Sequence, residues 1–206
     1  MMVGCTEKEA GNGKPEAAGN DETAGSVTGT SYDLTALLAE RKEKDEYFRQ
    51  TGSPIPEEQR TGFTGLRYYP PDSSLAFNLK LARLPQPEPA NITATKGDVR
   101  KMERYGTFSF TVNGKPCTLT AYTSATNPDN LFVPFKDATN DVETYGVGRY
   151  LDLEIKDDDL YQLDFNRAYN PYCAYNPGYT CPLVPLENVL DVAIRAGEML
   201  PADAGH

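Results

Sequence analysis

Histidine is almost missing from this chain of 206 residues, and the single one, His206, is the last residue. Catalytic Ser-His-Asp and Cys-His groups need a positioned imidazole, and so do most catalytic zinc sites. Because chain ends fray, His206 is poorly placed for that role. Any general acid or base is therefore expected to be Asp, Glu, Lys, Tyr or Cys. Tryptophan is missing altogether, which weakens the case for a platform that stacks sugar rings.

Positive charge is also in short supply. The chain has 20 Lys and Arg against 30 Asp and Glu, which gives a net charge of -10. This field repels phosphate backbones and anionic lipid surfaces, so we expect no nucleic-acid partner and no general adhesion to membranes. No segment has the apolar length of a transmembrane helix. The hydrophobic share of 39% is ordinary for a folded protein with one sizeable core.

No cofactor or metal motif stands out. The Gly146-Val147-Gly148 run is not followed by a helical pattern, so it is no phosphate-binding loop. Cysteines without histidine make a poor zinc site. The sequence therefore predicts no cofactor and no metal, and it leaves the oligomeric state open.

Residues 1–31 hold almost no bulky apolar side chain, which predicts a disordered tether ahead of one β-rich domain at 32–206. Small residues before Cys5 and a polar tether after it resemble the lipid-attachment site of a prokaryotic lipoprotein, although no charged or apolar region precedes Cys5. We therefore expect a lipid-anchored, extracytoplasmic protein of the cell envelope that touches the membrane only through Cys5. The alternative is a cytoplasmic protein.

The cysteines divide according to compartment. If Cys5 carries lipid, Cys173 and Cys181 are close enough in sequence to form a disulfide, which leaves Cys117 as a buried thiol. In a cytoplasmic protein all four cysteines are expected to stay reduced.

The pattern of residues 32–50 predicts a helix with Ser31 as its N-cap. Leu34, Leu37 and Leu38 form one apolar face. Three oppositely charged pairs are spaced i,i+4: Glu40 with Lys44, Arg41 with Asp45, and Lys42 with Glu46. We expect this charged face to be solvated rather than to bind a partner.

From residue 65 onward the hydrophobic period changes from helical to two, as in β-strands. Residues 75–82 alternate and predict a half-buried strand. Prolines at 85, 87 and 89 then interrupt the pattern, and residues 91–95 predict a further strand.

The Asn113-Gly114 pair is the clearest hairpin signal, because a type I′ turn needs positive φ at both central residues. The hairpin places Phe110 opposite Cys117 and Phe108 opposite Leu119. All four then share one face, so Cys117 is expected in the core.

A second hairpin is predicted from residues 149–155 and 160–166. Its register pairs Leu151 with Asp164 and makes Arg149 a diagonal neighbour of Asp164 on an apolar face. Because either ion alone would be costly to bury, we expect the two to be hydrogen-bonded. Several strands after one early helix predict a mainly β fold, an antiparallel sandwich or barrel-like domain with one N-terminal helix.

Several strings along the chain are unusual together: Phe63-Thr64-Gly65-Leu66, Leu131-Phe132-Val133-Pro134-Phe135, Leu163-Asp164-Phe165-Asn166-Arg167-Ala168-Tyr169-Asn170-Pro171, Cys173-Ala174-Tyr175, Cys181-Pro182-Leu183 and Ile194-Arg195-Ala196-Gly197-Glu198. Over roughly residues 34–198 they resemble the uncharacterised prokaryotic family known as domain of unknown function 1684. The resemblance implies no activity, although lipoprotein-like leaders occur among similar proteins. Similar proteins carry proline within the run at 187–200, so the resemblance favours an extended final strand near residues 192–196 over a helix.

Residues 143–198 concentrate polar and aromatic side chains, including seven of the 13 tyrosines. A pocket between the second hairpin and the loop at 170–185 is predicted to bind an anionic or hydroxyl-rich small molecule, with arginine as a bidentate donor. The alternative is a buried polar network that pins this loop to the sheet. The candidate ligand-binding residues are Arg149, Asp164, Asn166, Arg167, Tyr169, Asn170, Glu187 and Asn188.

Two classes of function follow from these observations. The first is a cell-envelope module that either binds a small molecule in a polar, Tyr-rich pocket or is purely structural. The alternative is a hydrolase that uses carboxylates among Glu143, Asp152 and Glu187, with or without a hard divalent metal. The spacing of these acids identifies no catalytic residue.

Overall fold

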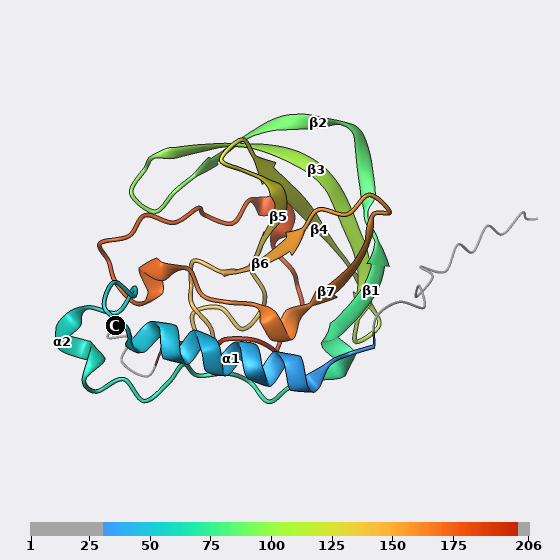
Figure 1. The fold of residues 1–206 in the computed structure, drawn as a ribbon. Coiled ribbons are helices and arrows are strands. Elements are labelled where there is room, and N and C mark those ends of the chain that lie inside the picture. The colour runs from blue at the N-terminus through green and yellow to red at the C-terminus, as the bar shows by residue number, and fades with distance from the viewer. Residues whose placement is uncertain (1–30, 202–206) are drawn as a thin grey trace, which may run out of the picture.

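Seven antiparallel strands form the body of the part of the chain that the structure, a computed structural model, describes: residues 31–201. Five strands form one sheet in the order β2-β3-β4-β5-β6, and the other two form the pair β1-β7. Helix α1 lies along one side of the strands (Figure 1). The elements are α1 (Leu34–Arg49), α2 (Glu57–Arg60), η1 (Ser73–Leu75), β1 (Ala76–Lys80), β2 (Ala82–Thr93), β3 (Val99–Val112), β4 (Lys115–Ser124), β5 (Asn127–Phe135), β6 (Arg149–Glu154), β7 (Leu160–Asp164), η2 (Phe165–Arg167), η3 (Tyr172–Ala174) and η4 (Leu186–Asn188), where η denotes a 3₁₀ helix.

The two sheets join into a barrel-like enclosure. Leu81 alone separates β1 from β2, so the chain passes directly from one sheet into the other. On the opposite side, Tyr150 of β6 and Tyr169, which follows β7, exchange two backbone hydrogen bonds of 2.9 and 3.0 Å. The strands curl around a common interior (Figure 1), which holds the larger of the two hydrophobic clusters of the described residues. The mainly β, antiparallel, barrel-like fold with one N-terminal helix is confirmed.

The first predicted hairpin is also confirmed. Both central residues of the Asn113-Gly114 turn have positive φ, 51° and 77°, as the turn type requires. Phe110 lies opposite Cys117 and Phe108 opposite Leu119. All four side chains are buried in the same core cluster, so Cys117 is a core residue as expected.

The second predicted hairpin is wrong. β6 pairs with β5, where Leu151 lies opposite Val133, and β7 pairs with β1, where Asp164 lies opposite Ala76. Residues 156–159 therefore connect two sheets rather than two neighbouring strands. A period of two in the sequence identifies the buried face of a strand, but it does not identify the strand beside it.

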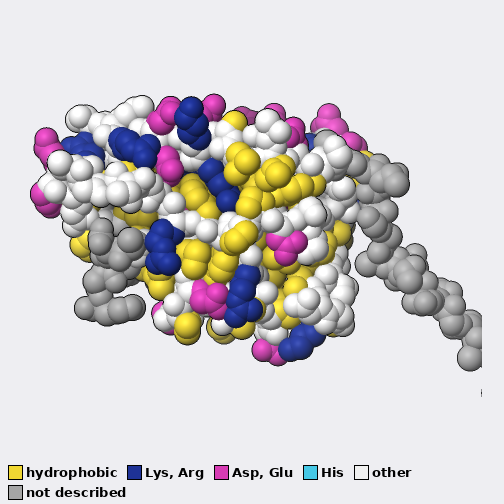
Figure 2. Space-filling model, turned by 90° about the horizontal axis from the view of Figure 1, so that it is seen from below, with side chains coloured by type: hydrophobic (Ala, Val, Ile, Leu, Met, Phe, Trp, Pro, Cys, Tyr) yellow, Lys and Arg dark blue, Asp and Glu magenta, His cyan; other side chains and the backbone are white. Residues whose placement is uncertain are grey.

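Helix α1 forms close to its predicted bounds, with a different cap. Asp33 rather than Ser31 is the N-cap, and its Oδ1 accepts a hydrogen bond from the Ala36 backbone N–H at 3.0 Å. Leu37 and Phe48 are buried, and Phe48 packs against the rings of Phe63 and Tyr175, whereas the other two leucines of the predicted apolar face remain about half exposed. Figure 2 views this side of the molecule and shows hydrophobic side chains among charged ones.

The charged face of α1 contacts the barrel, contrary to the prediction that it is only solvated. Glu40 pairs with Arg167, and Lys44 pairs with Glu198, instead of with each other. Of the three predicted intrahelical pairs, Lys42 with Glu46 is the one that forms among the described residues, with 3.9 Å between Lys42 Nζ and Glu46 Oε1. The barrel presents fixed partners of opposite charge, and these compete successfully with flexible neighbours on the helix surface.

The proline-rich segment does not interrupt its strand. β2 runs through all three prolines, with a register shift between Arg83 and Glu88. β2 is an edge strand of the five-stranded sheet. An edge tolerates proline because its outward N–H groups have no ladder partner.

The predicted final strand at residues 192–196 is absent from the described part of the chain. The segment is not helical, as expected, but it is irregular rather than a sheet member. The Ala138 backbone N–H donates to the Val192 carbonyl at 2.9 Å, and the Arg149 side chain holds the residues that follow.

The predicted tether, including Cys5, and the terminal His206 lie outside the described residues. Within residues 31–201, none of the helices combines the length and apolar character needed to span a membrane.

Candidate functional site

Arg149 lies in the middle of the predicted site region, but its side chain is fully buried. Its guanidinium donates to Asp137 Oδ2 at 2.8 Å. It also donates to three backbone carbonyls, those of Ile194 at 2.7 Å, Ala196, and Glu198 at 3.2 Å. These bonds hold the irregular C-terminal segment against the barrel. The positive charge of Arg149 is therefore compensated by groups within the protein.

Asp164, the predicted partner of that arginine, belongs to a different network. Asp164 Oδ1 accepts from the Asn166 backbone N–H at 2.9 Å and from its side-chain amide at 2.8 Å, and Oδ2 accepts from Arg167 at 2.6 Å. Asn166 exchanges two more hydrogen bonds with the backbone of Asp72, and Arg167 donates two to Glu40 of α1. The network therefore joins the end of β7 to the helix and to the segment before β1.

Glu187 and Asn188 anchor η4 to the sheet. Glu187 Oε1 accepts from the Tyr122 hydroxyl at 2.8 Å and from Arg104 at 2.9 Å. The buried Asn188 side chain bonds the backbone of Thr120 in both directions, at 2.8 and 2.9 Å, and a third bond reaches β5. Both residues are occupied by contacts within the chain.

Glu198 is a buried carboxylate that the sequence analysis did not select; its side chain is only 1% exposed. Its Oε1 lies 2.6 Å from Lys44 Nζ, and its Oε2 accepts from the Asn170 backbone N–H at 2.8 Å and the Tyr175 hydroxyl at 2.6 Å. Burial, followed by the nearby Glu198 charge, raises the pKa of Tyr175 well above its ordinary value. Lys44 Nζ also lies 4.7 Å from the centre of the Tyr169 ring, a cation–π contact. No local pattern marks this cluster, because its members are brought together by the fold.

The eight predicted ligand-binding residues thus lie in separate internal networks rather than around one opening. Ligand binding by these residues stays a prediction. The acids of the hydrolase hypothesis also have separate partners: Glu143 bonds Arg195 and Tyr69, Asp152 bonds Tyr169, and Glu187 bonds Tyr122 and Arg104. Across residues 31–201 no three His, Cys, Asp or Glu side chains gather as a metal site requires.

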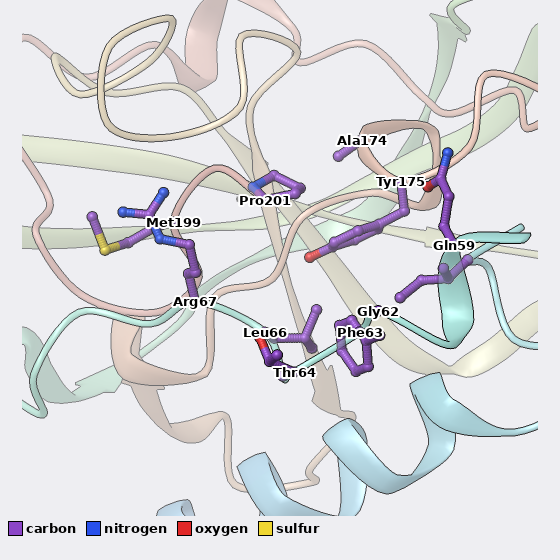
Figure 3. Close-up of a pocket in the computed structure, with 12 residues that line it drawn as sticks. Gln59, Gly62, Phe63, Thr64, Leu66, Arg67, Ala174, Tyr175, Met199 and Pro201 are labelled. Carbon is purple, nitrogen blue, oxygen red and sulfur yellow. The ribbon is translucent and has the colours of Figure 1, made fainter. Parts of the chain in front are cut away.

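A small cavity of about 80 Å³ lies between the segment that follows α2 and the end of the described chain. In Figure 3, Phe63 and Leu66 lie together on one side of this cavity, and Met199 and Tyr175 lie on two further sides. Its lining contains one charged side chain, Arg67, which is exposed. The volume accommodates a few waters or a very small molecule.

A larger groove of about 470 Å³ lies on the outer face of β3 to β6. Leu131 and Val133 of β5 face the core, so Phe132 between them points outward. Phe132 and Met102 of β3 contribute the apolar part of the groove, and Pro182 of the long loop lines it as well. The groove lies beside a second hollow of about 500 Å³ that shares Met102.

The charged groups of the groove come from the two outer strands of its floor. Arg100 is on β3 and Asp152 on β6, three strands apart, and Arg100 lies four residues along β3 from Arg104, the residue that the register places in line with Asp152. Burial raises the pKa of the Asp152 carboxyl, while the Tyr169 hydroxyl, which donates to Oδ2 at 2.5 Å, and the charge of Lys44 act in the opposite direction. The groove therefore has a cationic end and a carboxyl end.

The two cysteines of the predicted disulfide meet in the long loop. The Cys173 backbone N–H donates to Cys181 Sγ at 3.3 Å, and both side chains are free thiols. The disulfide itself stays a prediction. Cys117 is a buried thiol, as expected.

The fold and its networks define a class: a barrel-like antiparallel β domain whose C-terminal third is anchored by buried polar side chains. Residues 61–199 match the family described as protein of unknown function (DUF1684), and the chain belongs to this family. Among solved structures it is similar to an uncharacterised protein of Haloarcula marismortui, determined by solution NMR. The two are 37% identical over 82% of this chain and 95% of that chain, with a TM-score of 0.65. No curated protein matches this chain. The family resemblance is confirmed, and no activity comes with it.

Proposed function

We propose that this protein is a small-molecule-binding module whose ligand lies in the groove on the outer face of β3 to β6. The observation that carries the proposal is the groove itself. Its volume of about 470 Å³ falls within the range of small-molecule sites, and it combines an apolar floor with a few polar groups. Asp152 of β6 and Pro182 of the long loop contribute to its lining, but none of the eight predicted ligand-binding residues does.

The charges of the groove suggest the class of ligand. Arg100, whose Nε is paired with Asp98 at 3.0 Å, and Lys101 carry the positive charge that suits a carboxylate or sulfonate, and Asp152 suits a hydroxyl or amino donor. Met102 and Phe132 between them favour an apolar, flat body. We therefore expect an amphipathic acid with a flat apolar body.

The anionic fluorophore 8-anilinonaphthalene-1-sulfonate has this chemistry and serves as a probe. We expect saturable binding by the full chain, and we expect Met102→Glu to weaken it about tenfold or more, since the new carboxylate repels the sulfonate and removes the apolar contact. Arg100→Gln is expected to weaken it less, with an effect that shrinks as salt screens the charge.

Leu186→Glu is the matched control, because Leu186 is 89% exposed and lies outside the groove. This substitution introduces the same charge as Met102→Glu, and the variant is expected to bind the probe as tightly as the unmodified chain does. Equal binding by the Met102 and Leu186 variants, with unchanged circular dichroism, would remove the groove as the binding site.

We also infer that the module is held at the cell envelope by a lipid on Cys5. The support is the sequence alone: small residues before Cys5 and a polar tether after it. In a prokaryotic host fed labelled palmitate, the chain with a charged and apolar signal region placed before Met1 is expected to take up label and to sediment with membranes. Cys5→Ser is expected to abolish both, and a soluble, unlabelled parent chain contradicts the inference.

A further inference from the structure

The loop between β7 and η4 brings two thiols into contact. Cys173 belongs to η3 and Cys181 lies eight residues further on, yet the Cys173 N–H donates to Cys181 Sγ at 3.3 Å. Cys173 is partly exposed and Cys181 is buried. The pair is therefore preassembled, with one sulfur in reach of solvent.

The two thiols differ in acidity. The hydrogen bond from Cys173 lowers the pKa of the Cys181 thiol, and this effect outweighs the burial that opposes it. The same hydrogen bond raises the pKa of Cys173, which keeps its proton. Cys117 provides a contrast, because burial raises its pKa and no other cysteine among residues 31–201 contacts it.

The ends of this short loop are held differently. The Cys181 carbonyl accepts from the Thr95 backbone N–H at 2.9 Å, and the Cys181 N–H donates to the Thr95 hydroxyl at 3.1 Å, at the β2–β3 turn. Cys173 is held on its carbonyl by the Tyr145 hydroxyl at 3.3 Å. A covalent bond between the sulfurs therefore ties η3 to the β2–β3 turn.

We propose that Cys173 and Cys181 form a peroxide-oxidised dithiol site, in which Cys181 is the attacking sulfur and Cys173 the resolving one. The Cys181 thiolate attacks one oxygen of hydrogen peroxide; the S–O bond forms, the O–O bond breaks, and the hydroxide that leaves takes up a proton as water. The Cys173 sulfur then attacks the Cys181 sulfenic acid. The S–S bond forms, the S–O bond breaks, and the Cys173 proton leaves with the hydroxide as a second water. Two thiols are oxidised and one peroxide is reduced.

Peroxide is small enough to reach a sulfur beside a partly exposed one, and the contact between the thiols favours closure over further oxidation. The inference does not depend on the proposed groove, because it concerns only the loop and its two sulfurs. Closure constrains nine residues of the loop, so the oxidised protein is expected to unfold at a higher temperature than the reduced one.

The test treats the reduced full chain with stoichiometric hydrogen peroxide and counts alkylatable thiols by mass spectrometry after denaturation. We expect two of the four thiols to be lost, a peptide containing a Cys173–Cys181 bond, and full recovery with dithiothreitol. Cys117→Ser is the control, because it removes a buried thiol and is expected to leave the bond formation unchanged.

Two variants separate the roles of the sulfurs. Cys173→Ser is expected to stop at a Cys181 sulfenic acid that dimedone traps, whereas Cys181→Ser is expected to react at least about tenfold more slowly, because it lacks the more acidic thiol. Trapping on Cys173 in the Cys181 variant at the parent rate overturns the assignment of roles. Failure of the parent chain to form the bond, with both thiols oxidised no faster than Cys117, overturns the site.

Discussion

Arg149 and Asp137 form an ion pair of 2.8 Å in the interior of the barrel, with side chains that are 0% and 1% exposed. Removing two charges from water is expensive, so the pair needs further hydrogen bonds to be stable. Arg149 finds them on backbone carbonyls of residues 194–198, and Asp137 Oδ1 accepts from Thr139 and from the Ile194 N–H. The hydrogen bonds of this ion pair therefore take the place of the backbone hydrogen bonds that the segment would make as a strand of a sheet.

Replacing Arg149 by Met is expected to destabilise the fold by about 3–5 kcal/mol, because Asp137 and three carbonyls lose their donor in the interior. Arg149→Lys is expected to recover little, since an ammonium cannot reproduce the planar fork. Asp137→Asn, which keeps an acceptor for the guanidinium, is expected to cost less, about 1–3 kcal/mol. Urea unfolding of the three variants measures the order of their free energies of unfolding.

The double variant Arg149→Met with Asp137→Leu tests the carbonyl contacts. It removes both charges but leaves the carbonyls without a donor, so we expect it to remain less stable than the parent chain. A double variant as stable as the parent would show that the backbone bonds of Arg149 contribute nothing.

Lys44 is expected to matter more than its place on an exposed helix suggests. Its ammonium lies 2.6 Å from the buried Glu198 carboxylate, so Lys44→Met leaves that charge without its cation and is expected to lower stability by about 1.5–3 kcal/mol. Lys42→Met is the matched control, because Lys42 is 79% exposed in a surface pair with Glu46. Its expected effect is below about 0.5 kcal/mol. Equal effects on the thermal midpoint contradict a docking role for Lys44.

The two hairpins show which parts of the fold could be predicted from the sequence. At Asn113-Gly114 the turn chemistry and the alternation of the flanking residues agree, and every determinant is local. At residues 149–166 the alternation was equally clear, but the neighbours of both strands are distant in sequence. The sequence therefore predicts that these segments are strands and which face of each is buried, but it does not predict which strands lie beside them.

The candidate site shows the same limit. Residue types identified Arg149, Asp164 and Asn166 as polar groups in an apolar setting, which is correct. Whether such groups face a ligand or a buried partner depends on distant residues, such as Asp137 for Arg149. The groove escaped prediction because its floor combines side chains from four strands.

Gly197 is expected to be irreplaceable for a steric reason. It has φ of +75°, and a Cβ there falls 2.5 Å from the Ala168 carbonyl oxygen and 2.7 Å from that of Phe165. Gly197→Ala is expected to cost about 2–4 kcal/mol, from left-handed backbone strain together with overlap against backbone that cannot easily move.

Gly97 separates these two contributions. Its φ is similar, +86°, but nothing lies within 4 Å of the position that a Cβ would take, so Gly97→Ala carries the backbone strain alone. We expect a loss of about 1–2 kcal/mol there. If both alanine variants have the same urea midpoint, close packing around Gly197 is not what requires glycine.

Acid stability offers a test of two carboxyls with opposite shifts. Hydrogen bonds from Arg195, opposed by burial and assisted by Tyr69, lower the pKa of Glu143. The unfolded chain therefore binds this proton more readily, and the stability that Glu143 contributes is present above the unfolded pKa of about 4.3 and is lost as the pH falls through the folded value. For Asp152, burial raises the pKa, so the folded state binds the proton more readily and loses stability as the pH rises above about 4.

Glu143→Gln and Asp152→Asn are therefore expected to differ from the parent chain in opposite directions. Near neutral pH the Glu143 variant is expected to be less stable than the parent and the Asp152 variant more stable, because each removes the ionised form. Both differences are expected to shrink toward zero as the carboxyls of the parent become protonated, in the range below about pH 4. Thermal midpoints of the three proteins between neutral and acidic pH measure this convergence. A difference that keeps the same size at every pH shows that the amide substitution acts through packing, and not through the charge of the carboxyl.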